Sequence, residues 1–230
     1  MSAIEQQLLL DLGLRPAFSR EDFLVAHSNA AAVALIDQWP DWPSNAALIV
    51  GPAGSGKSHL VEVWRQISGA QTCDAIAITT EAVPELFSTG ALAVENVDQV
   101  SLPETAIFHT MNYARQHNLH LLFTARRRPE NWSVQLPDLA SRLHALPSVE
   151  ILRPDDALLR GVLVKHFADR QIAVDEPLIA YMILRMPRSL EAAGKLVHLI
   201  DEAALRERAE VTRSFVAKVM AAHESPDLFL

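Results

Sequence analysis

Before Pro154, short apolar runs alternate along the chain with segments of helical spacing. Residues 46–50 form a continuous apolar run of the length of a buried strand, and between residues 57 and 67 the apolar positions recur at the spacing of one helix face. Further apolar runs, each bounded by turn residues, predict strands at 75–78, 91–94, 119–123 and 149–152. This alternation predicts an α/β fold with a mostly parallel central sheet.

The pattern changes beyond Pro154. Four segments there have helical spacing, with no convincing strand between them: 155–170, 176–186, 189–208 and 212–223. We therefore expect three parts, namely an N-terminal peptide and linker at 1–17, an α/β nucleotide-binding domain at 18–153 and a small all-helical domain at 154–230.

A phosphate-binding loop pattern follows the first predicted strand. Residues 51–58 read Gly-Pro-Ala-Gly-Ser-Gly-Lys-Ser, with glycine at both required positions and then lysine and serine. In such a loop the backbone N–H groups surround a phosphate, Lys57 reaches the outer phosphates and Ser58 is a ligand of Mg²⁺. ADP or ATP with Mg²⁺ is therefore the expected cofactor. The candidate nucleotide-binding residues here are Gly51, Pro52, Ala53, Gly54, Ser55, Gly56, Lys57, Ser58 and the adjoining His59.

An acidic residue at the end of a neighbouring strand would complete the magnesium site. Glu95 is the candidate, and Asp98 is a second choice with a poorer offset from the strand. Glu95 is also compatible with a simple strand end beside solvent. Asn96 follows it, where many ATPases carry the acid that activates water, and an amide has no basic carboxylate for that task. We expect nucleotide binding with weak or no hydrolysis by this chain alone.

Charge and cysteine content narrow the class of protein. The 230 residues carry 28 Asp and Glu against 20 Lys and Arg, a formal net charge of −8, so no chain-wide positive field exists to hold nucleic acid. Cys73 is the single cysteine, which excludes an internal disulfide and fits the cytoplasm. The apolar runs are too short to cross a membrane, and the N-terminus lacks the basic start of a signal peptide.

Lys57, Glu95 and the trailing helices together resemble an AAA+ module of the initiator branch, which includes the replication initiator DnaA. The resemblance spans about residues 18–223 in the order of the elements. It implies an α/β P-loop domain followed by a small helical lid domain. It also implies that Phe23, Leu24 and Val25 belong to the segment that packs on the adenine base.

Two arginines take roles from the same resemblance. Residues 136–143 resemble the block with the arginine finger, which makes Arg142 a cation presented to the ATP of a neighbouring subunit. Residues 186–191 resemble the start of the sensor-two helix, which makes Arg188 a contact to the chain's own phosphates. A solvated helix charge and an interdomain salt bridge are the plainer interpretations of Arg142 and Arg188. Arg126 departs from the small or acidic residue usual in the sensor-one strand.

More narrowly, the chain resembles the DnaA-regulatory inactivator (Hda-like) family, which has one short N-terminal peptide and one AAA+ module. DnaA proper continues into a basic helix-turn-helix domain, and we expect none here because the sequence ends at Leu230. The residues Gln7, Leu8, Leu10 and Leu12 resemble the sliding-clamp-binding peptide of that family. A leucine-rich first turn of a core helix is the plainer interpretation.

The resemblance implies a regulator of replication initiation. Bound to the DNA-loaded sliding clamp (the DNA polymerase III beta subunit), it would supply Arg142 in trans to DnaA-bound ATP and leave inactive ADP-DnaA. DnaA and the clamp are then its partners, DNA is reached through the clamp, and a homodimer is compatible with such a module. An AAA+ DNA-binding loader or initiation accessory protein is the alternative, and a P-loop kinase is a third. The run Arg126, Arg127 and Arg128 is either a solvated loop or a contact to DnaA or DNA.

Overall fold

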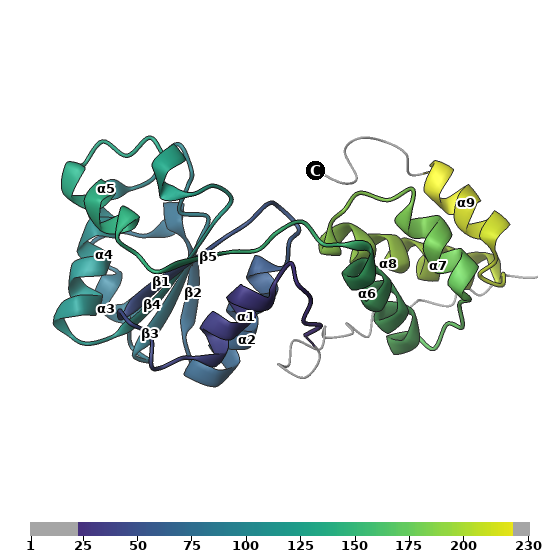
Figure 1. Ribbon diagram of the computed structural model, residues 1–230, viewed down its shortest axis with the longest axis horizontal. Coiled ribbons are helices and arrows are strands. Elements are labelled where there is room, and N and C mark those ends of the chain that lie inside the picture. Colours follow the sequence, from purple (N-terminus) through teal and green to yellow (C-terminus); the bar gives the residue numbers. More distant parts are fainter. Residues whose placement is uncertain (1–22, 223–230) are drawn as a thin grey trace, which may run out of the picture.

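A five-stranded parallel sheet organises the first part of the computed structural model, which describes residues 23–222 (Figure 1). The strand order is β2-β3-β4-β1-β5. The α/β class with a central parallel sheet, expected from the sequence, is confirmed. The strands are β1 (Ala46–Val50), β2 (Gln71–Asp74), β3 (Ala91–Glu95), β4 (His120–Ala125) and β5 (Ser148–Glu150).

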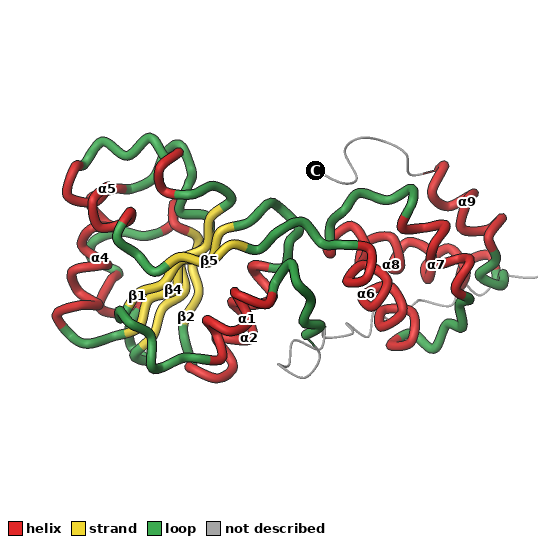
Figure 2. The backbone as a smooth tube through the Cα atoms, viewed as in Figure 1, coloured by secondary structure: helices red, strands yellow, loops and turns green. Residues whose placement is uncertain are grey.

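Helices cover both faces of this sheet (Figure 2). On one face α1 (Ala30–Asp37) and α2 (Lys57–Ser68) share a hydrophobic core with Ala47 and Ile49 of β1. On the other face α3 (Val83–Leu86), α4 (Glu104–Gln116) and α5 (Pro137–His144) share a second core with Leu48. Alternate residues of β1 therefore enter opposite cores, which explains why its sequence is apolar without interruption.

After β5 the described chain contains only helices, and we call this helical part the lid. Its helices are α6 (Asp156–Asp169), α7 (Glu176–Ile183), α8 (Leu190–Glu207) and α9 (Arg213–Ala222). They pack around their own core, in which Phe167, Met182 and Ile200 are fully buried. The division of the chain into parts at 1–17, 18–153 and 154–230 stays a prediction.

Side-chain caps start three of the lid helices. Asp155, Asp175 and Ser189 each accept a hydrogen bond from a backbone N–H in the first turn of α6, α7 and α8. Each such cap contributes on the order of 1 kcal/mol by satisfying a donor that the helix leaves unpaired. None of the helices in residues 23–222 combines the length and the apolar character needed to cross a membrane.

The predicted strand at 75–78 is wrong. The strand in this region is β2, four residues of mostly polar sequence, and it lies at the edge of the sheet beside β3. Asp74 ends it, because its carboxylate accepts the Ile76 N–H at 3.1 Å and turns the chain into a short 3₁₀ helix. An edge strand that is only partly covered needs no apolar run. The apolar residues of this region lie at 75–78 instead, and the strand was predicted there.

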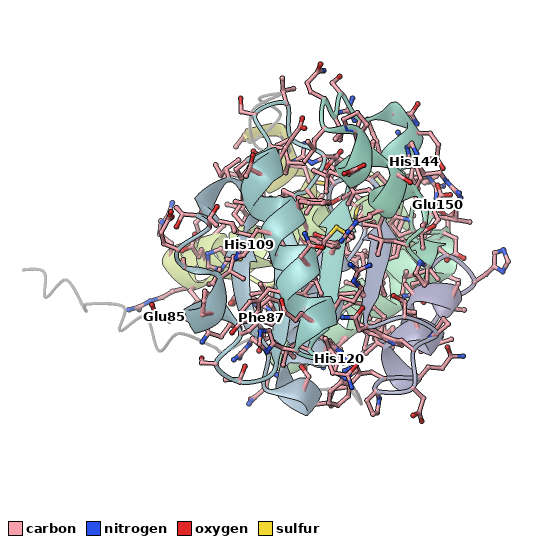
Figure 3. All side chains as sticks on the ribbon, turned by 90° about the vertical axis from the view of Figure 1, so that its left-hand side faces the viewer. Glu85, Phe87, His109, His120, His144 and Glu150 are labelled. Atoms are coloured by element: carbon pink, nitrogen blue, oxygen red, sulfur yellow. The ribbon has the colours of Figure 1, made fainter. Side chains whose placement is uncertain are left out.

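Aromatic side chains close the amino end of the sheet. The Trp42 and Trp64 rings stack with centroids 5.5 Å apart, and the Trp39 ring meets the His120 ring edge-on at 5.5 Å. Figure 3 shows His120 near the bottom of the view and Glu150 toward the top, at opposite ends of the sheet. Burial lowers the pKa of His120 below its ordinary value of 6.5.

We predict that the free energy of unfolding decreases as the pH falls below 6.5. Burial lowers the pKa of both His120 and His166, so below 6.5 the unfolded chain binds more protons than the folded one. Their stabilisation is complete above pH 6.5 and is lost as the pH falls through the folded-state values. Denaturant unfolding across this range measures the slope. It should flatten in His120→Gln/His166→Gln and persist in His144→Gln, whose side chain is exposed; equal slopes would contradict the assignment.

Candidate nucleotide site

Residues 51–56 form the turn between β1 and α2, at the carboxyl end of the parallel strands. The turn is tied to the neighbouring strand, because the Gly51 N–H donates to the Ala125 carbonyl at 3.0 Å. Gly54 and Gly56 have φ values of 68° and 102°, a left-handed region that favours glycine. The amino end of α2 therefore opens directly onto the turn, with N–H groups available to an anion.

The Lys57 ammonium lies inside this turn, and the residue is only 7% exposed. Its Nζ donates to the Gly51 carbonyl at 2.7 Å and to the Pro52 carbonyl at 2.8 Å. Burial lowers the pKa of Lys57, and the positive charge of Arg126 lowers it further. A phosphate entering the turn would therefore meet a cation whose hydrogen bonds go to two neutral carbonyls, with the carboxylates of Asp98 and Glu95 acting on its charge from farther away.

Ser58 and Glu95 meet between α2 and β3. The Ser58 Oγ donates to the Glu95 Oε2 at 2.6 Å. Hard oxygen atoms of this kind are what Mg²⁺ prefers, and a nucleotide-bound Mg²⁺ takes its remaining ligands from phosphates and waters. Residues 23–222 contain no group of three or more His, Cys, Asp or Glu that would hold a metal ion without a nucleotide. The Ser58 and Glu95 pair fits a magnesium ion that arrives with its nucleotide.

Asn96 is held on the side of β3 that faces away from the turn. Its Nδ2 donates to the Asp74 Oδ2 at 2.7 Å, and the Gln99 Nε2 donates to the other oxygen of Asp74 at 3.0 Å. Because Asp74 ends β2, which lies on the opposite side of β3 from β4 and β1, the Asn96 amide points away from Lys57. The structure therefore leaves no basic group at this position directed toward the turn.

Asp98, the second choice for the magnesium carboxylate, instead anchors the loop after β4. Its carboxylate accepts the backbone N–H groups of Arg126 and Arg127, each at 3.1 Å, and the Arg127 Nε lies 3.4 Å from Oδ2. The residue is buried, with 8% exposed. Sequence reasoning missed this role because no local pattern relates Asp98 to partners 28 and 29 residues away.

The segment expected to pack on adenine lies beside the start of α2. Phe23 is buried and its ring meets the His59 ring edge-on, with centroids 4.9 Å apart. Leu24 and Val25 are 38% and 54% exposed. Asn29 shapes this segment, since its side chain donates to the Leu24 carbonyl at 2.9 Å. Exposed apolar side chains next to the turn are the kind of surface on which a flat base packs.

The lid touches the turn through the start of α8. The Leu190 N–H donates to the Gly54 carbonyl at 2.8 Å. A Cβ atom added to Gly54 would lie 1.9 Å from the Ser189 Oγ, so the close approach requires glycine. The neighbouring Arg188 pairs with Asp156 of α6 at 2.6 Å. In this arrangement the Arg188 guanidinium is held at the base of the lid.

Arg142 lies on α5, away from the residues gathered around Lys57. Its guanidinium stacks on the Phe108 ring, 4.5 Å from the centroid, and Nη1 donates to the Asn112 Oδ1 of α4. The α4 and α5 helices cover the face of the sheet opposite α2 (Figure 1). The structure thus brings together the turn 51–56, Lys57, Ser58 and Glu95, and it leaves Arg142 on another surface. The clamp-peptide candidates Gln7, Leu8, Leu10 and Leu12 lie outside the described residues.

Sequence comparison relates the chain to DnaA, although no protein-family profile matches it. An uncharacterized protein of Haemophilus influenzae is 27% identical over 187 residues, covering 75% of this chain and 80% of the relative. The chromosomal replication initiator protein DnaA of Cutibacterium acnes is 26% identical over 222 residues, covering 85% of this chain and 44% of the relative. The chain spans about half the length of the DnaA proteins that it matches.

Structural comparison identifies the fold. Domain III of the Thermotoga maritima replication initiation protein DnaA superposes with a TM-score of 0.75, covering 92% of this chain and 98% of that domain at 17% identity. The chain has the fold of DnaA domain III. A DnaA bound to AMPPCP and single-stranded DNA superposes with a TM-score of 0.67 at 18% identity, covering 85% of this chain and 69% of that one. The expected AAA+ fold is confirmed at the level of DnaA domain III.

We predict that Asn96→Asp does not create an active ATPase. The new carboxylate would face the Asp74 carboxylate in a partly buried position, and the lost hydrogen bond should lower the free energy of unfolding by about 1.5–3 kcal/mol. Adding Asp74→Asn should recover stability, because it restores an amide and carboxylate pair. Denaturant unfolding and ATP turnover measure both effects, and rapid turnover by the single variant would contradict the prediction.

Proposed function

We propose that this chain is a nucleotide-bound regulator of replication initiation that supplies Arg142 in trans to ATP held by DnaA. The observation that supports this most directly is the position of Arg142 on α5, on the face of the sheet opposite α2. A cation on that face is available to another molecule. An arginine supplied by a partner accelerates hydrolysis by ~10³ to 10⁵ because it stabilises the charge that spreads over the transferred phosphoryl group.

The local contacts of Arg142 suit this role. Phe108 supports one face of the guanidinium and Asn112 fixes one of its edges. A guanidinium has five N–H donors, so others remain for phosphate oxygens. A side chain held in one position before binding loses less conformational entropy on binding, which favours an effective finger.

In this proposal the chain holds ADP or ATP of its own in residues 51–58, with Lys57 at the outer phosphates. The base packs on the segment from Phe23 to Val25, and Arg188 reaches the phosphates after it leaves Asp156. Ser58 and Glu95 would hold Mg²⁺, whose contribution when bound is to neutralise the charge of the phosphates. Buried Lys57 and the glycine turn support this assignment.

Little hydrolysis is expected from the chain's own site. Activation of water needs a positioned base, and the Asn96 side chain is a neutral amide that is hydrogen-bonded to Asp74. The nucleotide would then stabilise the module and its contact with the lid, while the hydrolysis that matters takes place on DnaA.

In this proposal, binding to the sliding clamp places the chain on DNA. Gln7, Leu8, Leu10 and Leu12 would bind an apolar groove of the clamp, with DNA reached through it. Tethering two weakly interacting modules to one DNA-loaded ring raises their effective concentration, so a modest direct contact between them suffices. This is the activity of the DnaA-regulatory inactivator family that the sequence resembles.

We predict that Arg142→Ala abolishes stimulation of DnaA-ATP hydrolysis, with a loss of about 10³-fold or the whole stimulated rate. Arg142→Lys should recover little, because an ammonium lacks the planar fork of a guanidinium. Hydrolysis of labelled ATP bound to DnaA, with clamp-loaded DNA present, is the measurement.

The matched control is Arg206→Ala, which removes an exposed arginine from α8 of the lid. It should stimulate hydrolysis like the unaltered chain, and both variants should keep nucleotide binding. Full stimulation by Arg142→Ala would eliminate the proposed role of this residue.

We predict that Gln7→Ala/Leu10→Ala prevents stimulation on clamp-loaded DNA without changing nucleotide binding. The double substitution removes a polar contact and an apolar anchor from the proposed clamp peptide. Clamp binding by the full chain and DnaA-ATP hydrolysis are the two measurements. Gln6→Ala, one residue earlier, is the control, and stimulation that does not depend on the clamp would instead favour a loader or accessory protein.

A further inference from the structure

The three consecutive arginines after β4 have different surroundings. The Arg127 Nε lies 3.4 Å from the Asp98 carboxylate, and its Nη2 donates to the Asp98 carbonyl at 3.1 Å. Arg128 pairs with Glu150 at 2.6 Å. Within residues 23–222 the Arg126 guanidinium makes neither an ion pair nor a side-chain hydrogen bond, and the residue is exposed. Two of the three cations are therefore neutralised, and Arg126 is available for a ligand.

The backbone places Arg126 beside the phosphate-binding turn. Ala125 pairs with Val50 in the ladder of β4 and β1, and the Ala125 carbonyl accepts the Gly51 N–H at 3.0 Å. Arg126 is the next residue after this contact. Its own N–H donates to Asp98 Oδ1 at 3.1 Å, so the point from which its side chain extends is fixed by a buried carboxylate.

The electrostatics of the turn favour a ligand with several negative charges. The Lys57 Nζ donates to the Gly51 carbonyl at 2.7 Å, and the Gly51 N–H donates to the carbonyl of Ala125, the residue before Arg126, so both cations extend from groups anchored at Gly51. Two cations held near one another repel, and an anion that contacts both relieves the repulsion. Neighbouring phosphate groups of one nucleotide are such an anion.

We propose that Arg126 is a phosphate-binding residue of this site and takes over part of the charge neutralisation that Mg²⁺ supplies to nucleotides. The inference rests on the proposed nucleotide binding and deepens it. A nucleoside diphosphate or triphosphate then binds with only weak dependence on Mg²⁺. Arg127 and Arg128 have no share in this binding, because their charges are already paired.

The experiment titrates ADP and ATP into the full chain, freed of copurified nucleotide, in Mg²⁺ and in EDTA. We expect EDTA to weaken binding to the unaltered chain by less than about threefold, a difference of well under 1.4 kcal/mol. Arg126→Ala should weaken binding in EDTA by about tenfold and much less in Mg²⁺, so that binding becomes Mg²⁺-dependent. Arg126→Lys should keep most of the binding in EDTA, since it keeps the charge.

Arg128→Ala is the control, because it removes an exposed, paired cation from the same loop. Thermal unfolding checks that each variant folds. A merely structural role of Arg126 would weaken binding equally with and without Mg²⁺, and that result overturns the inference, as does equal behaviour of Arg126→Ala and Arg128→Ala. An unaltered chain that binds with Mg²⁺ and not in EDTA overturns this inference alone. A chain that binds neither nucleotide in either buffer overturns the proposed nucleotide site as well.

Discussion

The carboxyl ends of parallel strands lie along one edge of a sheet. The candidate nucleotide site depends on this constraint, because its residues follow or end different strands. Gly51 follows β1, Glu95 ends β3 and Arg126 follows β4, although these residues are far apart in the sequence. The register Val50 to Ala125 and the Gly51 N–H bond fix how the turn meets its neighbouring loop. A slip of one residue would send every side chain of a strand to the opposite face and separate these groups.

Much of this arrangement is predictable from the sequence, because strands, helices and the phosphate-binding turn each have a recognisable local pattern of residues. The strand Ala46–Val50 is buried on both faces and therefore apolar throughout, and the glycines and Lys57 of the turn follow from phosphate chemistry. The four lid helices are equally visible from their helical spacing. Fold class and the position of the phosphate-binding turn therefore follow from the sequence alone.

Contacts between distant residues are the part that the sequence does not predict. The roles of Asp98 and Asp74 depend on partners more than 20 residues away, and no spacing rule connects them. The edge strand β2 was missed because partial burial removes the apolar pattern. The pairing of Arg188 with Asp156 likewise depends on how α6 and α8 lie together in the lid. In each case several residues could pair with the charged group by their chemistry, and the tertiary packing decides which of them lies next to it.

The absence of a side chain at Gly54 lets Ser189 and Leu190 rest directly on the turn. Because no side chain of Gly54 lies between the turn and the start of α8, a movement of the Gly54 peptide would also move the amino end of this 18-residue helix. A rod pivoting at one end magnifies small movements at its far end. One backbone hydrogen bond thus joins the turn to the whole length of α8.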